Sequence, residues 1–329
     1  MLGITYQQIL ITARTKTGEF TVDYSGISHH LVNRQSSIER EVYPMEVRRA
    51  DFAGSWYPGK EQDCRDIIDE FSNEALPCPG SGENVVGGIV PHAGWFYSGK
   101  IACNVIKCLN SKNKPDTCLI FGRHLHPGSD NFIMKEGRWK TPLGELEIDA
   151  GLAANLTAEF PFTVETASSY DPDNTIELQL PFLKYFFPSI RIVPIGVPPR
   201  PSSLAIGKRA VEISKNMGRS SIVLGSTDLT HYGYNYGYTP KGVGEDAIEW
   251  VKNVNDKKVV DLMLEMDGEG VIHESLRNKN ACCSGAAGAA IAAAKELGAK
   301  TGEKIIYSTS YDTQPDSSFV GYVGIIFQG

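Results

Sequence analysis

Two histidine-bearing segments carry residue types and spacing that suit the binding of a metal ion. In VVGGIVPHAGWFYSG (residues 85–99), His92 comes directly after a short apolar run that is predicted to be a buried strand. In TCLIFGRHLHPGSD (residues 117–130), His124 and His126 follow a second run of the same kind. Residues just beyond the carboxyl ends of strands line the ligand crevice of an open α/β sheet, so two such histidines could face one ion. A histidine at a strand end is more often a structural residue, so the spacing alone leaves both interpretations open.

Two adjacent cysteines, Cys282 and Cys283, stand at the start of a predicted helix that is rich in Gly and Ala. The unpaired backbone amides and the dipole at a helix start lower the pKa of a thiol, and this favours the thiolate that metals bind. The alternative is that the small residues serve only close packing of the helix. The spacing does not distinguish between the two cysteines.

The segment STDLTHYG places Asp228 and His231 three residues apart, after a predicted strand. A carboxylate beside an imidazole can orient a metal ligand, or it can act with the imidazole as acid and base toward a bound substrate. The alternative is an aspartate that caps a turn and a histidine on the surface.

Six strings occur in an order that resembles the Memo family, whose prokaryotic members are called AmmeMemoRadiSam system protein B. They run from about residue 47 to the end and read RRADFAGSWYPG, PHAGWFYSG, TPLGELEID, IELQLPFL, STDLTHYG and ACCSGAAGAAIAAAKELGA. The resemblance implies a fold similar to that of the class III extradiol dioxygenases, which open catechol rings with non-haem iron.

The resemblance also implies a ligand set for iron or copper, made of two histidines and a cysteine. Matched residue by residue, these are His92, His124 and Cys282. GRHLHPG departs from the family's more usual Gly-Pro-Asn-His-Thr, which leaves His126 as a competitor of His124. Cys283 stands where a glycine is more usual.

The residues around this implied metal site both follow and depart from the family pattern. The resemblance places Asp228 and His231 near the metal, where they are the candidate catalytic residues. Asn174 stands where the pattern has a histidine, and an amide cannot transfer a proton near neutral pH. Glu177, at the front of a predicted helix, is expected to serve capping and the helix dipole.

Alternating apolar strands and amphipathic helices predict an α/β fold with a mixed, largely parallel sheet and helices on both faces, similar to the class III extradiol dioxygenases. Residues 47–329 are expected to form one domain, and residues 1–46 a peripheral extension in which residues 8–12 and 19–23 could pair as a hairpin. The predicted strands are 85–90, 117–121, 190–196, 221–224, 304–310 and 320–327; the predicted helices are 62–75, 97–109, 176–187, 203–217, 246–266 and 285–297.

Composition limits the partners and the compartment. The net charge is −7, and no run of basic residues accumulates, so a nucleic-acid partner is not expected. No apolar stretch approaches the roughly 20 residues that cross a bilayer, so no membrane partner is expected. The seven cysteines show no CxxC pattern, and they predict reduced, buried thiols in a cytoplasmic protein. The sequence does not indicate an oligomeric state.

The leading interpretation is a metal-dependent redox protein whose substrate the sequence does not identify and whose metal crevice takes a small-molecule or peptide ligand; whether it is an oxidoreductase stays open. Efficient catechol cleavage is not expected, because Cys282 replaces the carboxylate ligand of the ring-opening enzymes and Asn174 replaces a histidine. One alternative is a non-catalytic binding module lined by Trp95, Phe96, Tyr97 and the aromatic residues of 232–238. Another is a protein that sequesters metal.

Overall fold

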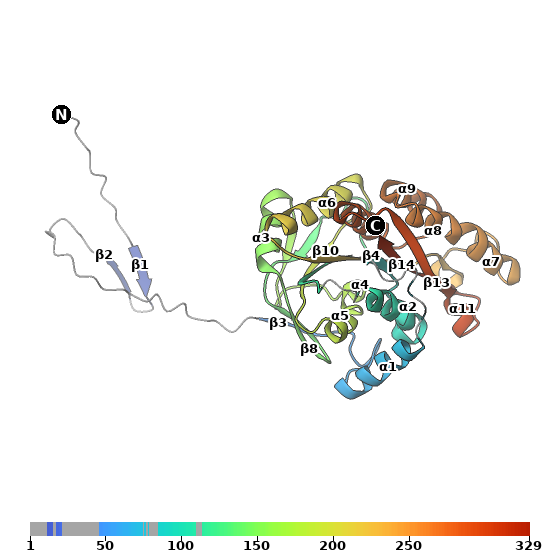
Figure 1. Cartoon of the computed structure of the whole chain (residues 1–329), viewed down its shortest axis with the longest axis horizontal. Helices are drawn as coiled ribbons and strands as arrows, with labels where there is room; N and C mark the ends of the chain where they lie inside the picture. Colours follow the sequence, from blue (N-terminus) through green and yellow to red (C-terminus); the bar gives the residue numbers. More distant parts are fainter. Residues whose placement is uncertain are drawn as a thin grey trace, which may run out of the picture. The chain divides into compact units, whose positions relative to one another are not determined.

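The computed structural model describes residues 46–74, 76, 78, 85–109 and 114–329, and the backbone of residues 12–15 and 18–21. The chain separates into two units, Met1–Pro44 and Met45–Gly329 (Figure 1). In the first unit, β1 (Thr12–Thr15) pairs antiparallel with β2 (Gly18–Thr21). The described strands overlap the predicted hairpin at Thr12 and at residues 19–21. The rest of the predicted hairpin, residues 8–11 and 22–23, lies outside the described residues.

In the described part of the second unit, nine strands form one mixed sheet. Its centre is four parallel strands in the order β4 (Val85–Val90), β11 (Ser221–Ser226), β5 (Thr117–Gly122) and β10 (Arg191–Gly196). Antiparallel pairing adds β14 (Phe319–Gln328) to β4, and β12 (His231–Tyr232) and β13 (Thr301–Thr309) to β14. At the other edge, β6 (Phe132–Met134) is antiparallel to β10, and β9 (Thr163–Glu165) is parallel to β6.

The central strands are apolar along their whole length because both faces of the sheet are covered. In β5, Cys118 and Ile120 pack into the core on one face, whereas Leu119 and Phe121 pack into the core on the other. Burying an aliphatic or aromatic side chain of this size stabilises a fold by about 1.5–3 kcal/mol. The run TCLIFG therefore reads as a continuous apolar strand and shows no polar alternation.

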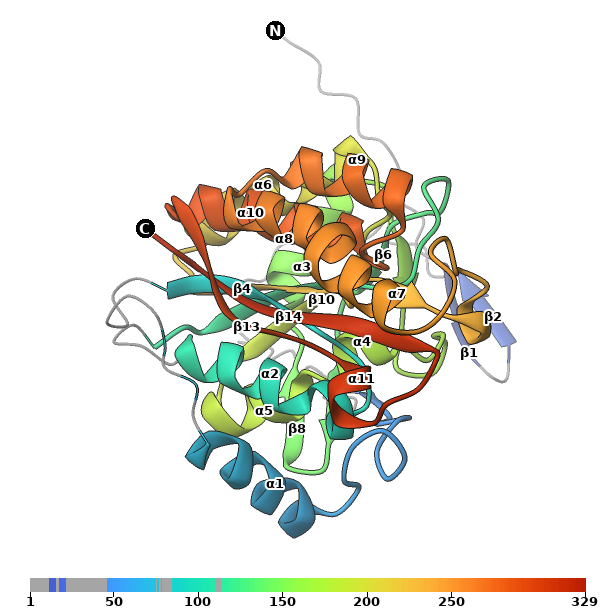
Figure 2. The same cartoon turned by 90° about the vertical axis from the view of Figure 1, so that its right-hand side faces the viewer.

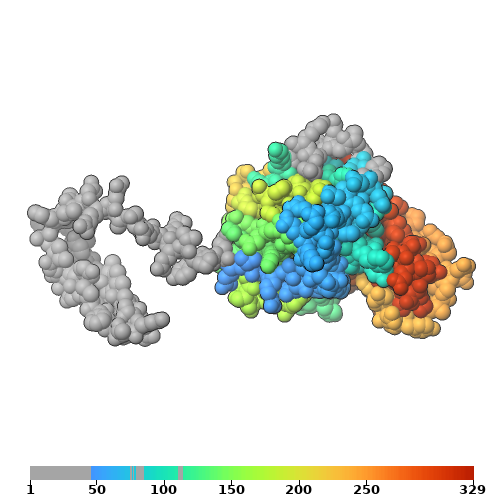
Figure 3. All heavy atoms as spheres, turned by 90° about the horizontal axis from the view of Figure 1, so that it is seen from below, coloured from blue at the N-terminus to red at the C-terminus, as the bar shows by residue number. Residues whose placement is uncertain are grey.

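Helices cover both faces of the sheet (Figure 2). One face carries α3 (Ala150–Glu159), α6 (Pro201–Asn216), α8 (Asp256–Leu264), α9 (Gly268–Asn278) and α10 (Ser284–Leu297). The other carries α1 (Glu61–Asn73), α2 (Trp95–Cys108), α4 (Asn174–Glu177) and α5 (Leu180–Phe186). On this second side, α1 and the segment before it, blue in Figure 3, form part of the outer surface. The predicted α/β fold with a mixed sheet between two helical layers is confirmed.

The smaller elements complete the second unit. They are the sheet of β3 (Val47–Arg48), β7 (Arg138–Thr141) and β8 (Gly144–Glu147), the helices α7 (Glu245–Trp250) and α11 (Ser310–Thr313), and the 3-10 turn η2 (Tyr234–Tyr236). Residues Val251–Asn255 form a π-helical turn, η3, between α7 and α8.

Two predicted helices are interrupted. The helix predicted over 176–187 divides into α4 and α5, and Pro181 stands in the first turn of α5. A proline ring clashes with the carbonyl four residues earlier and lacks an N–H, so a continuous helix through this point is disfavoured. The helix predicted over 246–266 is divided by the π-helical turn.

The small residues of α10 allow close packing against neighbouring backbone, which was one of the two roles expected for them from the sequence. A Cβ added to Gly207 of α6 would lie 2.1 Å from the carbonyl oxygen of Ala289 in α10, and one added to Gly285 would lie 2.4 Å from Pro198. Both are closer than real Cβ atoms come, so glycine is needed at these positions.

One expectation about the cysteines is wrong. Cys78 and Cys108 form a disulfide, with their Cα atoms 5.8 Å apart. The two residues are separated by 30 positions, and Cys108 lies in an apolar helix end, so no short motif in the sequence indicated the pair. Cys64, Cys103, Cys118, Cys282 and Cys283 are free thiols.

No helix in the described part of the chain has the length and apolar character needed to cross a membrane.

Candidate metal centre

His92 is held in one orientation by its hydrogen bonds. It follows β4 and is 1% exposed, and its backbone N–H donates to Asp228 Oδ1 at 2.7 Å. Its ring Nδ1 lies 3.0 Å from Ser226 Oγ. The Ser226 hydroxyl donates its single hydrogen to the Thr175 carbonyl at 2.6 Å, so toward His92 it can only accept. Nδ1 therefore carries a proton, and Nε2 is the nitrogen that faces Cys282 Sγ, 3.3 Å away.

The residue before His124, Arg123, has a strained backbone conformation. Arg123, between β5 and His124, has a φ of 76°, a left-handed conformation that costs a residue with a Cβ about 1–2 kcal/mol. Its backbone N–H donates to Thr175 Oγ1 at 2.7 Å, and its guanidinium pairs with Glu165 at 2.6 Å. These contacts hold the turn so that the His124 ring meets the His92 ring edge to face, with centroids 4.8 Å apart.

His126, the competitor of His124, lies in a separate turn. Its Nδ1 accepts from the Gly128 N–H at 3.2 Å, and its own N–H donates to Ser129 Oγ at 3.1 Å. It is exposed and is not among the residues whose ligand atoms converge. The structure therefore brings His124, and not His126, to His92.

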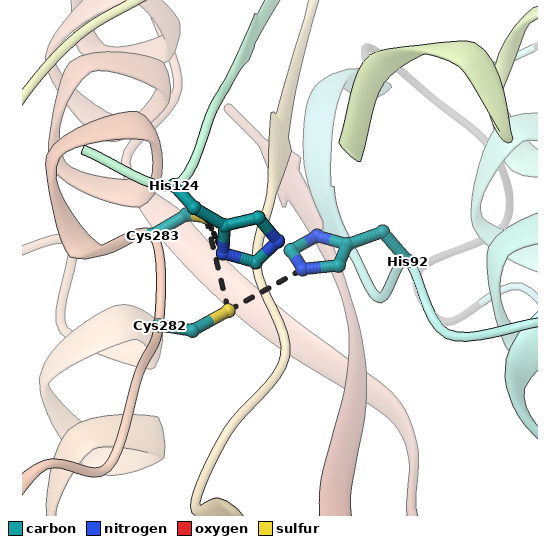
Figure 4. A group of neighbouring side chains, drawn as sticks. All are labelled: His92, His124, Cys282 and Cys283. Carbon is teal, nitrogen blue, oxygen red and sulfur yellow. Dashed lines mark hydrogen bonds between the residues drawn. The ribbon is translucent and has the colours of Figure 1, made fainter. Parts of the chain in front are cut away.

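Cys282 and Cys283 both direct their sulfur atoms to the two histidines (Figure 4). The Cys282 N–H donates to the Asp228 carbonyl at 3.1 Å, and the Cys283 N–H donates to Thr227 Oγ1 at 3.0 Å. The two Sγ atoms are 3.7 Å apart, and Cys283 Sγ is 3.4 Å from His124 Nδ1. One ligand atom from each of the four side chains lies within 4.8 Å of every other.

The charges of this group are coupled. Burial by itself lowers the pKa of His92, but the negative charges of Asp228 and Cys282 outweigh burial and raise the pKa to about 9. Burial would raise the pKa of Cys282, yet Cys283 and His92 together lower it well below its usual value. Burial and the neighbouring Cys282 raise the pKa of Cys283. Without a metal, the arrangement therefore favours an imidazolium–thiolate pair of His92 and Cys282.

The donor types suit a transition metal. Imidazole nitrogen and thiolate sulfur are ligands that iron, copper and zinc share, whereas magnesium and calcium prefer oxygen. The three residues matched by resemblance, His92, His124 and Cys282, are all in the group. Cys283, which the sequence offered only as an alternative to Cys282, is in the group together with it. The signal for it was present, because Cys283 is adjacent to Cys282 in the sequence.

Asp228 and Asn174 contact the group through His92. Asp228 is 3% exposed, and its Oδ2 lies 3.8 Å from His92 Nε2 while its Oδ1 accepts from the His92 backbone. The Asn174 amide donates to the His92 carbonyl at 3.1 Å. Both residues thus position His92, and Asn174 also faces the cavity described below.

His231 lies beside the group rather than within it. It begins β12, its Nδ1–H donates to the Leu229 carbonyl at 3.2 Å, and its ring meets the Tyr236 ring edge to face at 5.0 Å. Its Nε2 is therefore the nitrogen that can exchange a proton with a ligand in the cavity.

Glu177 has a role that differs from the predicted helix capping. Its carboxylate is fully buried and accepts from the backbone N–H groups of Asp51 and Phe52 and from the Tyr57 hydroxyl, at 3.0, 2.8 and 2.9 Å. It ties the segment before α1 to α4. Because Trp56 of this segment lines the cavity, Glu177 supports the cavity wall.

A cavity of about 630 Å³ opens over His92 and His124, and its wall also includes Asn174, Asp228 and His231. Among the predicted lining residues, Phe96, Tyr97 and Tyr236 do line it, and Phe96 is 72% exposed. Two others are core residues instead: Trp95 stacks on Phe182 with centroids 4.1 Å apart, and Tyr232 is buried.

Comparison with known proteins identifies similar chains. The model of the family described as Memo-like protein matches residues 48–326. A MEMO1 family protein of Pyrococcus furiosus is 32% identical over 293 residues, which cover 86% of this chain and 99% of that protein. A MEMO1 family protein of Methanopyrus kandleri is 32% identical over 288 residues, covering 84% and 97%. Among solved structures, an uncharacterized protein of Escherichia coli K12 aligns with 74% of this chain and 99% of its own, at 12% identity and a TM-score of 0.44.

Proposed function

Because this chain belongs to the Memo-like protein family, we propose that it binds one iron or copper ion through His92, His124 and Cys282. The observation that supports this most directly is the convergence of their ligand atoms within 4.8 Å of one another. The orientation of His92 supports it further, since a metal-binding histidine typically donates its other ring N–H to a fixed acceptor. Here that acceptor is Ser226 Oγ.

We propose a redox role for this site. Iron or copper would supply one-electron chemistry at the floor of the cavity. The protein itself contributes a buried carboxylate, Asp228, that holds His92 in place, and a cavity of about 630 Å³ that admits a small molecule or a peptide segment. His231 can give or take a proton at its Nε2, whereas the Asn174 amide can only bind and orient.

The compartment must keep the ligand thiols reduced. We propose the cytoplasm, where thiols normally remain reduced. The Cys78–Cys108 disulfide argues against a reducing compartment. The number of free thiols, measured in protein isolated from cells without added reductant, therefore tests the cytoplasmic location.

The metal site is tested by elemental analysis of protein purified without chelators or nickel resin. We expect about one iron or copper per chain, and substantial loss in His92→Ala, His124→Ala and Cys282→Ala. His126→Ala is the matched control, because it removes a neighbouring imidazole that lies outside the group. Full occupancy in all the ligand variants would refute the site. Loss of metal in His126→Ala but not in His124→Ala would replace His124 with His126 as the ligand.

The redox role is tested separately by oxygen uptake with candidate reductants, which supply the electrons that oxygen accepts. Metal-dependent uptake that is lost in the ligand variants would support an oxidoreductase. Stable metal binding without uptake would favour a metal-sequestering protein, and a peptide that binds equally well to metal-free protein would favour a binding module.

A further inference from the structure

The Cys283 side chain faces the neighbouring donor atoms and does not cap α10. Cys283 is the N-cap residue of α10, yet its side chain accepts no hydrogen bond from the first turn of the helix. Its Sγ instead lies 3.4 Å from His124 Nδ1 and 3.7 Å from Cys282 Sγ. The Thr227 hydroxyl accepts from the Cys283 N–H and fixes the backbone from which this side chain projects.

Three of the six distances between the four donor atoms are close to those of a tetrahedral site. Bonds of about 2.3 Å to sulfur and about 2.0–2.1 Å to nitrogen place two sulfur ligands about 3.8 Å apart, and a sulfur and a nitrogen about 3.6 Å apart. The sulfur–sulfur distance here is 3.7 Å. The two sulfur–nitrogen contacts, Cys282 to His92 and Cys283 to His124, are 3.3 and 3.4 Å.

We propose that Cys283 is a fourth metal ligand, which closes the site into a two-histidine, two-cysteine set that favours Cu(I) and Zn²⁺ over Fe(II). This inference rests on the proposed metal site and adds to it the ligand number and the metal preference. Two thiolates are soft donors, and a tetrahedral set of two sulfurs and two nitrogens is typical of zinc-type sites. An iron oxygenase instead keeps open positions for substrate and oxygen.

The burial of Cys283, next to the partly exposed Cys282, supports the same conclusion. Cys283 is 3% exposed, and a second thiolate 3.7 Å from the first would be strongly disfavoured without a cation. A divalent ion balances two thiolates, and Cu(I) leaves one negative charge. Metal binding and the release of the Cys283 proton are therefore coupled.

The inference is tested with Co²⁺, whose sulfur-to-metal absorption bands count thiolate ligands. The variant Cys283→Ala is compared with Cys118→Ala, which removes a free, buried thiol of β5 that packs in the sheet core and lies outside the group of converging donor atoms. In a reduced, metal-free starting protein, we expect Cys283→Ala to lose about half of the sulfur-to-cobalt absorption, since one of two thiolate ligands is removed. Cys118→Ala should keep the wild-type spectrum.

A second readout is affinity, measured by competition with a chromophoric chelator. Loss of a residue that only orients a ligand costs about 10–100-fold in metal affinity, so loss of a ligand should weaken Zn²⁺ binding of Cys283→Ala by more than this. Binding of Fe(II) should change less. If Cys283→Ala does not fold, X-ray absorption of zinc-loaded wild-type protein still counts the sulfur neighbours, two as expected or one against the inference.

The two proposals fail in different ways. Wild-type protein that binds none of these metals would refute the metal site itself. Wild-type protein that binds metal with one sulfur ligand, or a Cys283→Ala variant with unchanged spectrum and Zn²⁺ affinity, would refute the role of Cys283 and leave the three-ligand site intact.

Discussion

At the scale of single residues, the Ser226 hydroxyl decides which nitrogen of His92 is available to a metal. Its hydrogen is used by the Thr175 carbonyl, so it accepts from His92 Nδ1 and leaves Nε2 facing the sulfurs. Ser226→Ala should therefore lower metal affinity by about 10–100-fold while all ligands remain. The measurement is a chelator-competition titration of the variant and wild type.

Ser203→Ala is the matched control for this prediction, because Ser203 is a fully buried serine of α6 whose hydroxyl donates to the Pro198 carbonyl before the helix. Both variants lose a buried hydrogen bond, which costs about 1 kcal/mol of stability. Equal metal affinities in the two variants would show that His92 does not depend on Ser226 for its orientation.

The sequence indicated most residues of the converging group but not the hydrogen bonds and ion pairs that position them. Residue type and position after a strand indicated His92, His124 and His126, and the family resemblance selected His124 and Cys282. The choice of His124 over His126 depends on the left-handed turn at Arg123, whose ion pair with Glu165 comes from a distant strand. A contact between residues so far apart in sequence leaves no local pattern.

At the scale of elements, a buried carboxylate joins α8 to the segment that carries His231. Asp256, at the start of α8, accepts from the Thr230 N–H at 3.0 Å and from the Tyr307 hydroxyl of β13 at 2.7 Å. Burial outweighs these bonds and raises the pKa of Asp256 from 3.8 to about 6. The folded protein thus holds this proton more tightly than the unfolded chain does.

This difference makes stability depend on pH. Because the folded-state pKa is raised, the contribution of Asp256 is fully present below about pH 4 and is lost as the pH rises through about 6. In Asp256→Asn the group no longer titrates. The unfolding free energy of wild type minus that of the variant should therefore fall by about 1–3 kcal/mol between pH 4 and 7, measured by urea unfolding. A difference that stays constant with pH would contradict the prediction.

Elements were predictable where they are long and apolar. The strand predicted over 85–90 coincides with β4, because alternating side chains go to two buried faces and the whole run is hydrophobic. Short strands such as β6 and β9 were missed, since three residues carry too little periodicity. The break between α4 and α5 was foreseeable from Pro181, which the helical spacing of the apolar residues around it obscured.

At the scale of the whole molecule, the boundary of the folded body should lie just before β3. The Memo-like match begins at residue 48, and Arg48 is 1% exposed, pairs with Glu165 at 3.1 Å and lies over the Trp139 ring at 3.6 Å. A chain that begins at Pro44 should therefore unfold cooperatively on heating and keep its metal.

A chain that begins at Asp51 is the contrasting variant, because it also loses β3 and Arg48. Removing one partner of a buried ion pair costs about 3–5 kcal/mol, so this shorter chain should melt at a clearly lower temperature. Non-cooperative unfolding of the chain beginning at Pro44 would show instead that residues 1–43 are needed by the fold.

The architecture of the whole molecule does not by itself fix its chemistry. The resemblance implies a fold shared with catechol-opening enzymes, which hold Fe(II) with two histidines and a carboxylate and leave open positions for substrate and oxygen. In this chain a thiol, Cys282, faces His92 at 3.3 Å, and thiolates are softer ligands and open to oxidation. Asn174, which occupies the place of a family histidine, donates its amide to the His92 carbonyl.

We therefore expect no efficient ring cleavage. A proton-transferring side chain typically contributes about 10²–10⁴-fold to rate, and an amide at position 174 cannot supply it. The test loads the protein anaerobically with Fe(II), adds a panel of catechols and oxygen, and follows the yellow ring-fission product. Turnover near the median for enzymes of about 10 s⁻¹ would overturn the prediction. Asn174→His is the informative variant: a gain of activity would show that the missing proton transfer limits the reaction, whereas no gain would leave the Cys282 thiolate as the cause.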